Sequence, residues 1–139
     1  MKLQYIIPAL SLVTFAAAGD YKASCDVLDL SNNQYLNAQC GGPNGKLRTI
    51  LDLNKCIGVN PDGTMLPLAD GKYAKRCQLC GLSDSSVMTC NCLDGGDKTQ
   101  VVSIDLNDLV SNVDGYLHCD LSGEDGECIK QWSDDIECP

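Results

Sequence analysis

The chain has 139 residues, ten of which are cysteines, and its formal net charge is −9. Because phosphate contacts dominate nucleic-acid affinity, an acidic chain without a basic cluster is a poor candidate for binding nucleic acid, and we expect no such partner. An even number of cysteines in a short chain favours a framework of disulfides.

Residues 1–18 have the pattern of a secretory signal peptide. Lys2 precedes an apolar stretch that ends in small residues, and we expect cleavage after Ala18. The stretch is short for a membrane-spanning helix and contains Pro8, so we expect a secreted, extracellular protein with no membrane insertion. Export places the cysteines in an oxidising compartment, where we expect all of them to be bridged. The mature chain then has a net charge of −10, from nine Lys and Arg residues against 19 Asp and Glu, and its roughly 120 residues fit one domain.

The mature chain contains one unit twice, as residues 25–65 and 77–117. At a shift of 52 positions, Cys25 aligns with Cys77 and Cys40 with Cys92. The shift becomes 53 for a later Asp-Leu-Asn segment and then returns to 52. Loops permit such one-residue changes and strands do not. Duplication followed by divergence is the simplest explanation.

Each copy begins with two alternating apolar runs around a turn signal, which is typical of a short β-hairpin with a cysteine at each open end. A glycine-rich loop follows, and then a strand-like run that ends in Asp-Leu-Asn, where Asp52 and Asp105 are expected to cap a helical turn. The Asp-Gly dipeptides that begin at Asp62 and Asp114 favour tight turns. No segment has a sustained helical apolar period, so we predict a mainly β domain over residues 19–119.

Residues 120–139 form an acidic tail beyond the second copy. Its composition alone is typical of disorder, but Cys128 and Cys138 indicate that the tail is tied to the domain. We expect Trp132, the only tryptophan, to anchor the tail to the core.

Within each hairpin, the natural disulfide joins the open ends, which gives Cys25–Cys40 and Cys77–Cys92. Each closed loop contributes on the order of 3 kcal/mol to stability by chain entropy.

The second hairpin carries an additional pair, Cys80 and Cys90. Opposed residues of an antiparallel hairpin have a constant index sum; the nested pairs give 170 and 169 and the crossed pairs 167 and 172, so we prefer Cys80–Cys90. The crossed pairing and a zinc site built from the same four sulfurs are the alternatives, and export disfavours zinc. Three connectivities are open for the remaining cysteines, which are Cys56, Cys119, Cys128 and Cys138.

The order of these motifs resembles the cyanovirin-N homology (CVNH) domain. The matching segments are Ser24-Cys25 with Leu28 and Leu30, Leu36-Asn37-Ala38-Gln39-Cys40, Ile104-Asp105-Leu106-Asn107 and Asn112-Val113-Asp114-Gly115-Tyr116-Leu117. The resemblance implies an all-β fold: a pseudo-symmetric, two-lobed, disulfide-stapled β-barrel made from the two tandem repeats, with strands exchanged between the lobes. It also implies a lectin for oligomannose-type glycans or glycoproteins, with no catalysis and no cofactor. We expect no metal site, and the sequence leaves a monomer or a domain-swapped dimer open.

The resemblance implies one sugar site per lobe, formed around the first and second cysteines of one repeat and the Asn-x-Asp-Gly turn of the other. Carried over, the first site comprises Ala23, Ser24, Gly41, Pro43, Asn44, Asn112, Val113 and Asp114. The second comprises Lys75, Arg76, Leu93, Asp94, Asp97, Asn60 and Asp62. A sugar site needs fixed donors and acceptors that match vicinal hydroxyls. The second set offers more of them, so we expect it to be the better site.

Simpler interpretations exist for the same residues. The Asn and Asp residues of both turns are typical turn formers that bond their own backbone, and Arg76 is equally well explained as a solvated charge. Gly41-Gly42-Pro43 and Leu93 stand where the resemblance implies polar side chains. The competing hypothesis is a secreted structural or interaction protein that keeps the stapled scaffold and has lost sugar binding.

Overall fold

A computed structural model of the chain describes residues 19–83 and 86–128. The predicted signal peptide, Trp132 and Cys138 lie outside the described residues. Strands dominate the described part, and its helical segments are single 3-10 turns, so the fold is all-β as predicted. None of the helical segments in that part is long and apolar enough to span a membrane.

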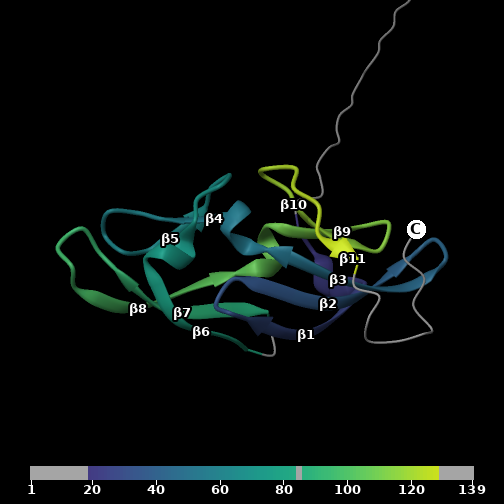
Figure 1. The fold of residues 1–139 in the computed structure, drawn as a ribbon, viewed down its shortest axis with the longest axis horizontal. Coiled ribbons are helices and arrows are strands. Elements are labelled where there is room, and N and C mark those ends of the chain that lie inside the picture. The colour runs from purple at the N-terminus through teal and green to yellow at the C-terminus, as the bar shows by residue number, and fades with distance from the viewer. Residues whose placement is uncertain (1–18, 84–85, 129–139) are drawn as a thin grey trace, which may run out of the picture.

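Each repeat forms one antiparallel sheet from its first three strands (Figure 1). The first sheet contains β1 (Cys25–Ser31), β2 (Tyr35–Gly42) and β3 (Gly45–Asp52), and a short strand near the C-terminus, β11 (Glu127–Cys128), pairs with β3. The second sheet contains β6 (Cys77–Leu82), β7 (Val87–Leu93) and β8 (Thr99–Asp105). The predicted hairpins are confirmed, because Cys25 lies opposite Cys40 and Cys77 opposite Cys92.

The middle strand of each sheet supplies much of the core. Leu36, Ala38 and Cys40 of β2 are fully buried, and alternate residues of β7 are buried in the same way. A strand turns successive side chains to opposite faces, so the alternation seen in the sequence becomes one apolar face per sheet. Full burial of a side chain such as Leu36 stabilises the fold by about 1.5–3 kcal/mol.

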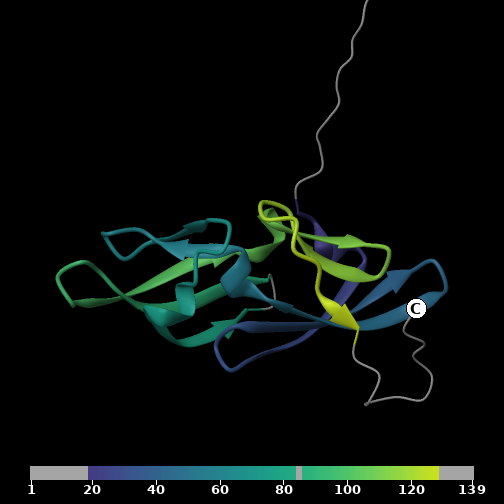
Figure 2. The same cartoon turned by 45° about the horizontal axis from the view of Figure 1, so that its top comes forward.

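The second half of each repeat is a hairpin that covers the sheet of the other repeat (Figures 1 and 2). The hairpin of β4 (Ile57–Val59) and β5 (Met65–Pro67) contacts β8. The hairpin of β9 (Val110–Val113) and β10 (Tyr116–Cys119) contacts β2 and β3. Each lobe therefore draws strands from both repeats. The ladders over residues 19–83 and 86–128 form four separate sheets, so the predicted barrel closure is not observed there.

The described residues contain four 3-10 turns, which precede or connect the strands: η2 (Tyr21–Ala23), η3 (Leu53–Lys55), η4 (Tyr73–Lys75) and η5 (Leu106–Asp108). The predicted caps are confirmed at η3 and η5. Asp52 accepts a hydrogen bond from the Asn54 N–H at 3.0 Å, and Asp105 accepts one from the Asn107 N–H at 2.9 Å.

Two equivalent tyrosines join the repeats. Tyr21 and Tyr73 are separated by the repeat shift of 52 and are fully buried. The Tyr21 hydroxyl is hydrogen-bonded to the Ser86 hydroxyl, and the Tyr73 hydroxyl donates to the Asn33 carbonyl. Each tyrosine thus reaches the hairpin turn of the opposite repeat. The repeat shift, extended upstream of the first cysteines, is the sequence signal that identifies this pair.

The disulfides settle the pairing within the hairpins. Cys25–Cys40, Cys77–Cys92 and Cys80–Cys90 form as preferred, so the crossed pairing and the zinc site are wrong. A further disulfide, which joins Cys56 to Cys119, links the first repeat to the second. Cys128 is also disulfide-bonded.

Candidate functional site

The first candidate site lies where the start of β1 meets the end of β2. Turn η2 delivers Ser24 to the strand, and the Cys25–Cys40 disulfide fixes the two strand ends beside each other. The Gly41 N–H donates to the Ser24 carbonyl at 3.0 Å. These contacts position the Ser24 side chain at the rim of the first lobe, where it is exposed.

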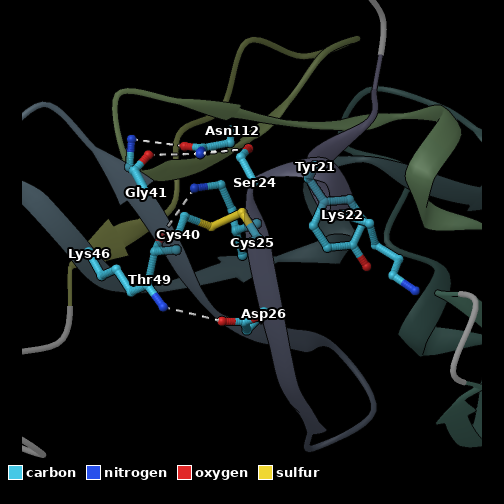
Figure 3. The surroundings of a disulfide bond; sticks show 12 residues. Tyr21, Lys22, Ser24, Cys25, Asp26, Cys40, Gly41, Lys46, Thr49 and Asn112 are labelled. Carbon is cyan, nitrogen blue, oxygen red and sulfur yellow. Dashed lines mark hydrogen bonds and ion pairs between the residues drawn. A yellow bond between two sulfur atoms is a disulfide. The ribbon is translucent and has the colours of Figure 1, made fainter.

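Asn112 of the second repeat joins this rim (Figure 3). Its Nδ2 donates to the Ser24 hydroxyl and to the Gly41 carbonyl, both at 2.9 Å, and its Oδ1 accepts from the Gly115 N–H at 2.8 Å. Both amide hydrogens are therefore used. The Ser24 hydroxyl accepts from Asn112 and keeps its own hydrogen for another acceptor.

The turn after Asn112 packs closely on the first repeat. Asp114 and Gly115 have φ values of 55° and 98°, which suit the two-residue hairpin turn that the Asp-Gly dipeptide predicts. A Cβ on Gly42 would lie 2.8 Å from the Asp114 carbonyl oxygen, so only glycine permits this approach. Asp114 and Gly115, which the sequence predicts as turn formers, thus fix how the second repeat packs against the first at this site.

A groove of about 500 Å³ runs beside this rim. It is lined by Gly19, Asp20, Ala23, Ser24, Ser111, Asn112 and Val113. Four of the predicted residues therefore lie together in the groove: Ala23, Ser24, Asn112 and Val113. Gly41, which is bonded to Asn112, and Asp114, which packs on Gly42, lie beside it. Pro43 and Asn44 lie in the exposed turn between β2 and β3 and are not lining residues. Sequence reasoning missed Gly19, Asp20 and Ser111, because they precede or fall between the matched motifs.

The second candidate site repeats the backbone of the first with different side-chain partners. The Leu93 N–H donates to the Arg76 carbonyl at 2.8 Å, as Gly41 does to Ser24. However, Arg76 Nη2 donates to the Leu93 carbonyl at 2.5 Å, and Asn60 Nδ2 donates to Thr64 at 3.0 Å. The Asn112 amide bridges two segments in the first lobe. Its equivalent in the second lobe, the Asn60 amide, is hydrogen-bonded within its own turn instead.

The acidic residues of the second site also hold turns. Asp94 Oδ1 accepts from the Gly96 N–H at 2.7 Å and from the Lys98 N–H at 3.0 Å. Asp62 Oδ1 accepts from the Thr64 hydroxyl at 2.6 Å, and this hydrogen bond lowers the pKa of the Asp62 carboxyl. One oxygen of each carboxylate is therefore committed to the backbone or its neighbour.

The two loops of the second site nevertheless lie against each other. The Gly95 N–H donates to the Pro61 carbonyl at 2.7 Å, and Gln100 Nε2 donates to the Asp62 carbonyl at 2.5 Å. Lys75, at the end of η4, and Asp97, in the β7–β8 turn, are exposed. The predicted residues thus occupy neighbouring loops, without the bridge that Asn112 provides in the first lobe.

A proline explains why the lobes differ. Pro61 stands where the second repeat has Val113, which pairs with Tyr116 in the β9–β10 ladder. Proline has no N–H and a fixed φ, so it cannot take the same place in a ladder. The first-repeat hairpin instead pairs Val59 with Met65 and leaves a longer loop.

A groove of about 580 Å³ lies elsewhere, between β1 and the β6–β7 hairpin. It is lined mainly by β1 residues such as Val27 and Leu28, together with Gly81 and Leu82 of β6. None of the predicted sugar-site residues lines it, so its size does not make it the candidate site. Within residues 19–83 and 86–128, no group of three or more His, Cys, Asp and Glu side chains is placed to hold a metal ion.

The fold and the first groove define a class of protein: a pseudo-symmetric two-repeat β protein with a polar groove where the repeats meet. A comparison with known families matches residues 21–131 to the CVNH domain, so the chain belongs to the CVNH family. No curated protein sequence matches the chain.

Solved structures with the same fold include proteins bound to sugars. A MoCVNH3 variant in complex with (N-GlcNAc)4 has a TM-score of 0.66 and 15% identity, with 76% of this chain and 99% of that chain covered. The CVNH protein of T. borchii has a TM-score of 0.59 and 27% identity, with 72% and 98% covered. Microvirin in complex with mannobiose has a TM-score of 0.60 and 25% identity, with 73% and 98% covered.

Proposed function

We propose that the protein is a secreted lectin that binds mannose-type glycans, with no catalytic step and no cofactor. Membership of the CVNH family and the likeness to microvirin, which is described with mannobiose, support carbohydrate binding. The observation that carries the proposal is the groove of the first lobe, where Asn112 holds Ser24 and Gly41 in one rigid arrangement.

The proposed chemistry is recognition of vicinal hydroxyls. The Ser24 hydroxyl offers a donor whose position Asn112 fixes, and Asn112 Oδ1 keeps one lone pair after bonding Gly115. A sugar that lacks a hydroxyl at either point leaves these groups unpaired, which gives selectivity. Ala23 and Val113 add apolar surface for the sugar ring.

We propose the second lobe as a second, weaker site. Arg76 uses one nitrogen for the Leu93 carbonyl and retains other N–H groups for a ligand, with Asp94 nearby as acceptor. Lys75, Asp97, Asn60 and Asp62 complete this site. Two sites on one chain increase avidity toward branched glycans. We rank the first site above the second, against the order expected from the sequence, because no side chain in the second site bridges two segments as Asn112 does.

The competing function is a structural or interaction role without sugar binding. It is supported by the second lobe, where Arg76, Asp94 and Asp62 all bond their own neighbours. A scaffold that has lost its ligand is expected to satisfy its polar groups internally.

A glycan array followed by titration tests the proposal. The refolded mature chain is expected to bind oligomannose in preference to GlcNAc oligomers. Asn112→Ala should weaken binding about tenfold or more, because it frees Ser24 and Gly41, and Arg76→Ala or Asp94→Ala should have smaller effects. Asn37→Ala is the matched control, since Asn37 bonds Asp29 on β1, away from the groove. Preference for GlcNAc oligomers would overturn the mannose assignment, and no binding to any glycan would favour the scaffold role.

A further inference from the structure

The backbone nitrogen of Gly19 lies in a site formed by Ser111 of β9 and by Asp120, directly after β10. The Gly19 N–H donates to Asp120 Oδ2, and the Ser111 hydroxyl donates to the other oxygen of the same carboxylate. Gly19 is buried and Asp120 is half-buried. Asp120 directly follows Cys119, which is bonded to Cys56, so the carboxylate is held on a stapled part of the fold.

The backbone on either side of this contact is also fixed. The Asp20 N–H donates to the Asn107 carbonyl at 2.6 Å, and the Lys22 N–H donates to Asn107 Oδ1 at 3.0 Å. Gly19 has a φ of +82°, and a Cβ there would lie 2.0 Å from the Asn107 carbonyl oxygen. Only glycine fits this position, so the contacts around Asp120 require glycine as the residue that supplies the nitrogen.

Among the described residues, Asp120 forms no ion pair with a basic side chain. Across residues 19–83 and 86–128, the ion pairs involve other carboxylates, those of Asp26, Asp70 and Asp125. A partly buried carboxylate that receives only neutral donors is poorly compensated, and a cation in contact with it stabilises it further. Of the described groups in contact with Asp120, the Gly19 nitrogen becomes a cation if the chain is cut before it.

We propose that the Ala18–Gly19 bond is the processing site and that Asp120 receives the new α-ammonium group of Gly19. Water adds across the peptide bond; the carboxylate remains on Ala18, and the freed amino group of Gly19 takes up a proton at neutral pH. A neutral N–H···carboxylate contact becomes an ion pair. Removal of the leader therefore locks the first residues of the mature chain onto its last β-hairpin.

Gly19 and Ser111 also line the groove of the first candidate site, but the proposal is tested by stability, a measurement that needs no sugar. Three forms of the folded chain are compared: one with a free Gly19 amine, one with N-acetyl-Gly19, and one that retains Ala18. The free form is expected to have a Tm about 5 °C above the other two. In Asp120→Asn this difference should disappear. Asp108→Asn is the matched control, because Asp108 is exposed and adjacent to Asn107, and it should leave the difference intact.

A second measurement covers the case in which Asp120→Asn fails to fold. The wild-type Gly19 amine should react with an amine-selective reagent about tenfold more slowly in the folded protein than in the denatured protein, as followed by mass spectrometry. Equal Tm values for the free and acetylated forms, a Tm difference that persists in Asp120→Asn, or equal reactivity in the folded and denatured states would each overturn the proposal. N-terminal sequencing of the exported protein that began at any residue other than Gly19 would overturn the processing site.

Discussion

Tyr21 and Tyr73 each connect the repeats through one buried hydroxyl. Burial raises the pKa of both hydroxyls well above the usual value, and the nearby carboxylates of Asp105 and Asp52 raise it further. The folded state therefore holds these protons more tightly than the unfolded state, in which tyrosine ionises near pH 10. The stabilisation is fully present below about pH 10 and is lost as the pH rises above that value.

This linkage predicts a steep alkaline loss of stability. Above about pH 10, the free energy of unfolding should fall by up to about 1.4 kcal/mol per pH unit for each of the two tyrosines. Urea unfolding of the wild type, Tyr21→Phe and Tyr73→Phe between pH 8 and about pH 11.5 measures the slopes. Each single substitution is expected to remove about half of the tyrosine contribution. Slopes in both variants equal to that of the wild type would contradict the prediction.

The short strand β11 depends on one close contact. The Gly126 N–H donates to the Leu117 carbonyl at 2.6 Å, and the next two residues pair with Ile50 and Thr49 of β3. A Cβ on Gly126 would lie 2.7 Å from the Ile50 carbonyl oxygen and 2.8 Å from the Thr49 hydroxyl. Position 126 must therefore lack a side chain for the segment after the second repeat to pair with β3 in this way.

Gly126→Ala is therefore expected to displace β11 and to lower the free energy of unfolding by about 1–3 kcal/mol. Urea unfolding gives the change, and amide hydrogen exchange should show lower protection at Ile50 than in the wild type. Gly81→Ala is the matched control in β6, because nothing lies within 4 Å of the added Cβ, and its effect should stay within about 0.5 kcal/mol. Equal losses in the two variants would mean that the contact at Gly126 is not the cause.

The hairpins could be predicted from the sequence because their signals are local. Alternating apolar residues, paired cysteines and the Asp114-Gly115 turn each act within a few residues, and the structure confirms them. The Cys56–Cys119 disulfide and the pairing of β11 join segments distant in sequence, and no local pattern encodes them. For the candidate site, the resemblance to the CVNH domain predicted which segments lie next to each other, including Ser24 and Asn112. The change that Pro61 makes to the second lobe depends on a ladder register that spacing alone does not determine.

The exchange of hairpins makes the two lobes mutually dependent. The apolar face of the β1–β3 sheet is covered by β9 and β10, which belong to the other repeat, and β4 and β5 cover the second sheet in turn. The contacts of Tyr21 and Tyr73 and the Cys56–Cys119 disulfide also cross between the repeats. A single repeat contains a complete sequence unit, but we expect that it does not fold independently, because the hairpin that covers its sheet belongs to the other repeat.

Separate expression of the repeats tests this dependence. Residues 19–76 alone keep β1–β3 but lose the β9–β10 hairpin that covers them. Residues 77–139 alone lose the β4–β5 hairpin in the same way. Each fragment is therefore expected to be unfolded and to give poorly dispersed amide signals in NMR spectra. Mixing them should restore the dispersed spectrum, since the interlocked hairpins need no chain connection between β5 and β6 in order to pack. The matched control is the full chain nicked after position 76, which should keep its native spectrum. A dispersed spectrum and cooperative unfolding of residues 19–76 alone would show that one repeat can form a lobe without its partner. That result would contradict the dependence inferred from the exchanged strands.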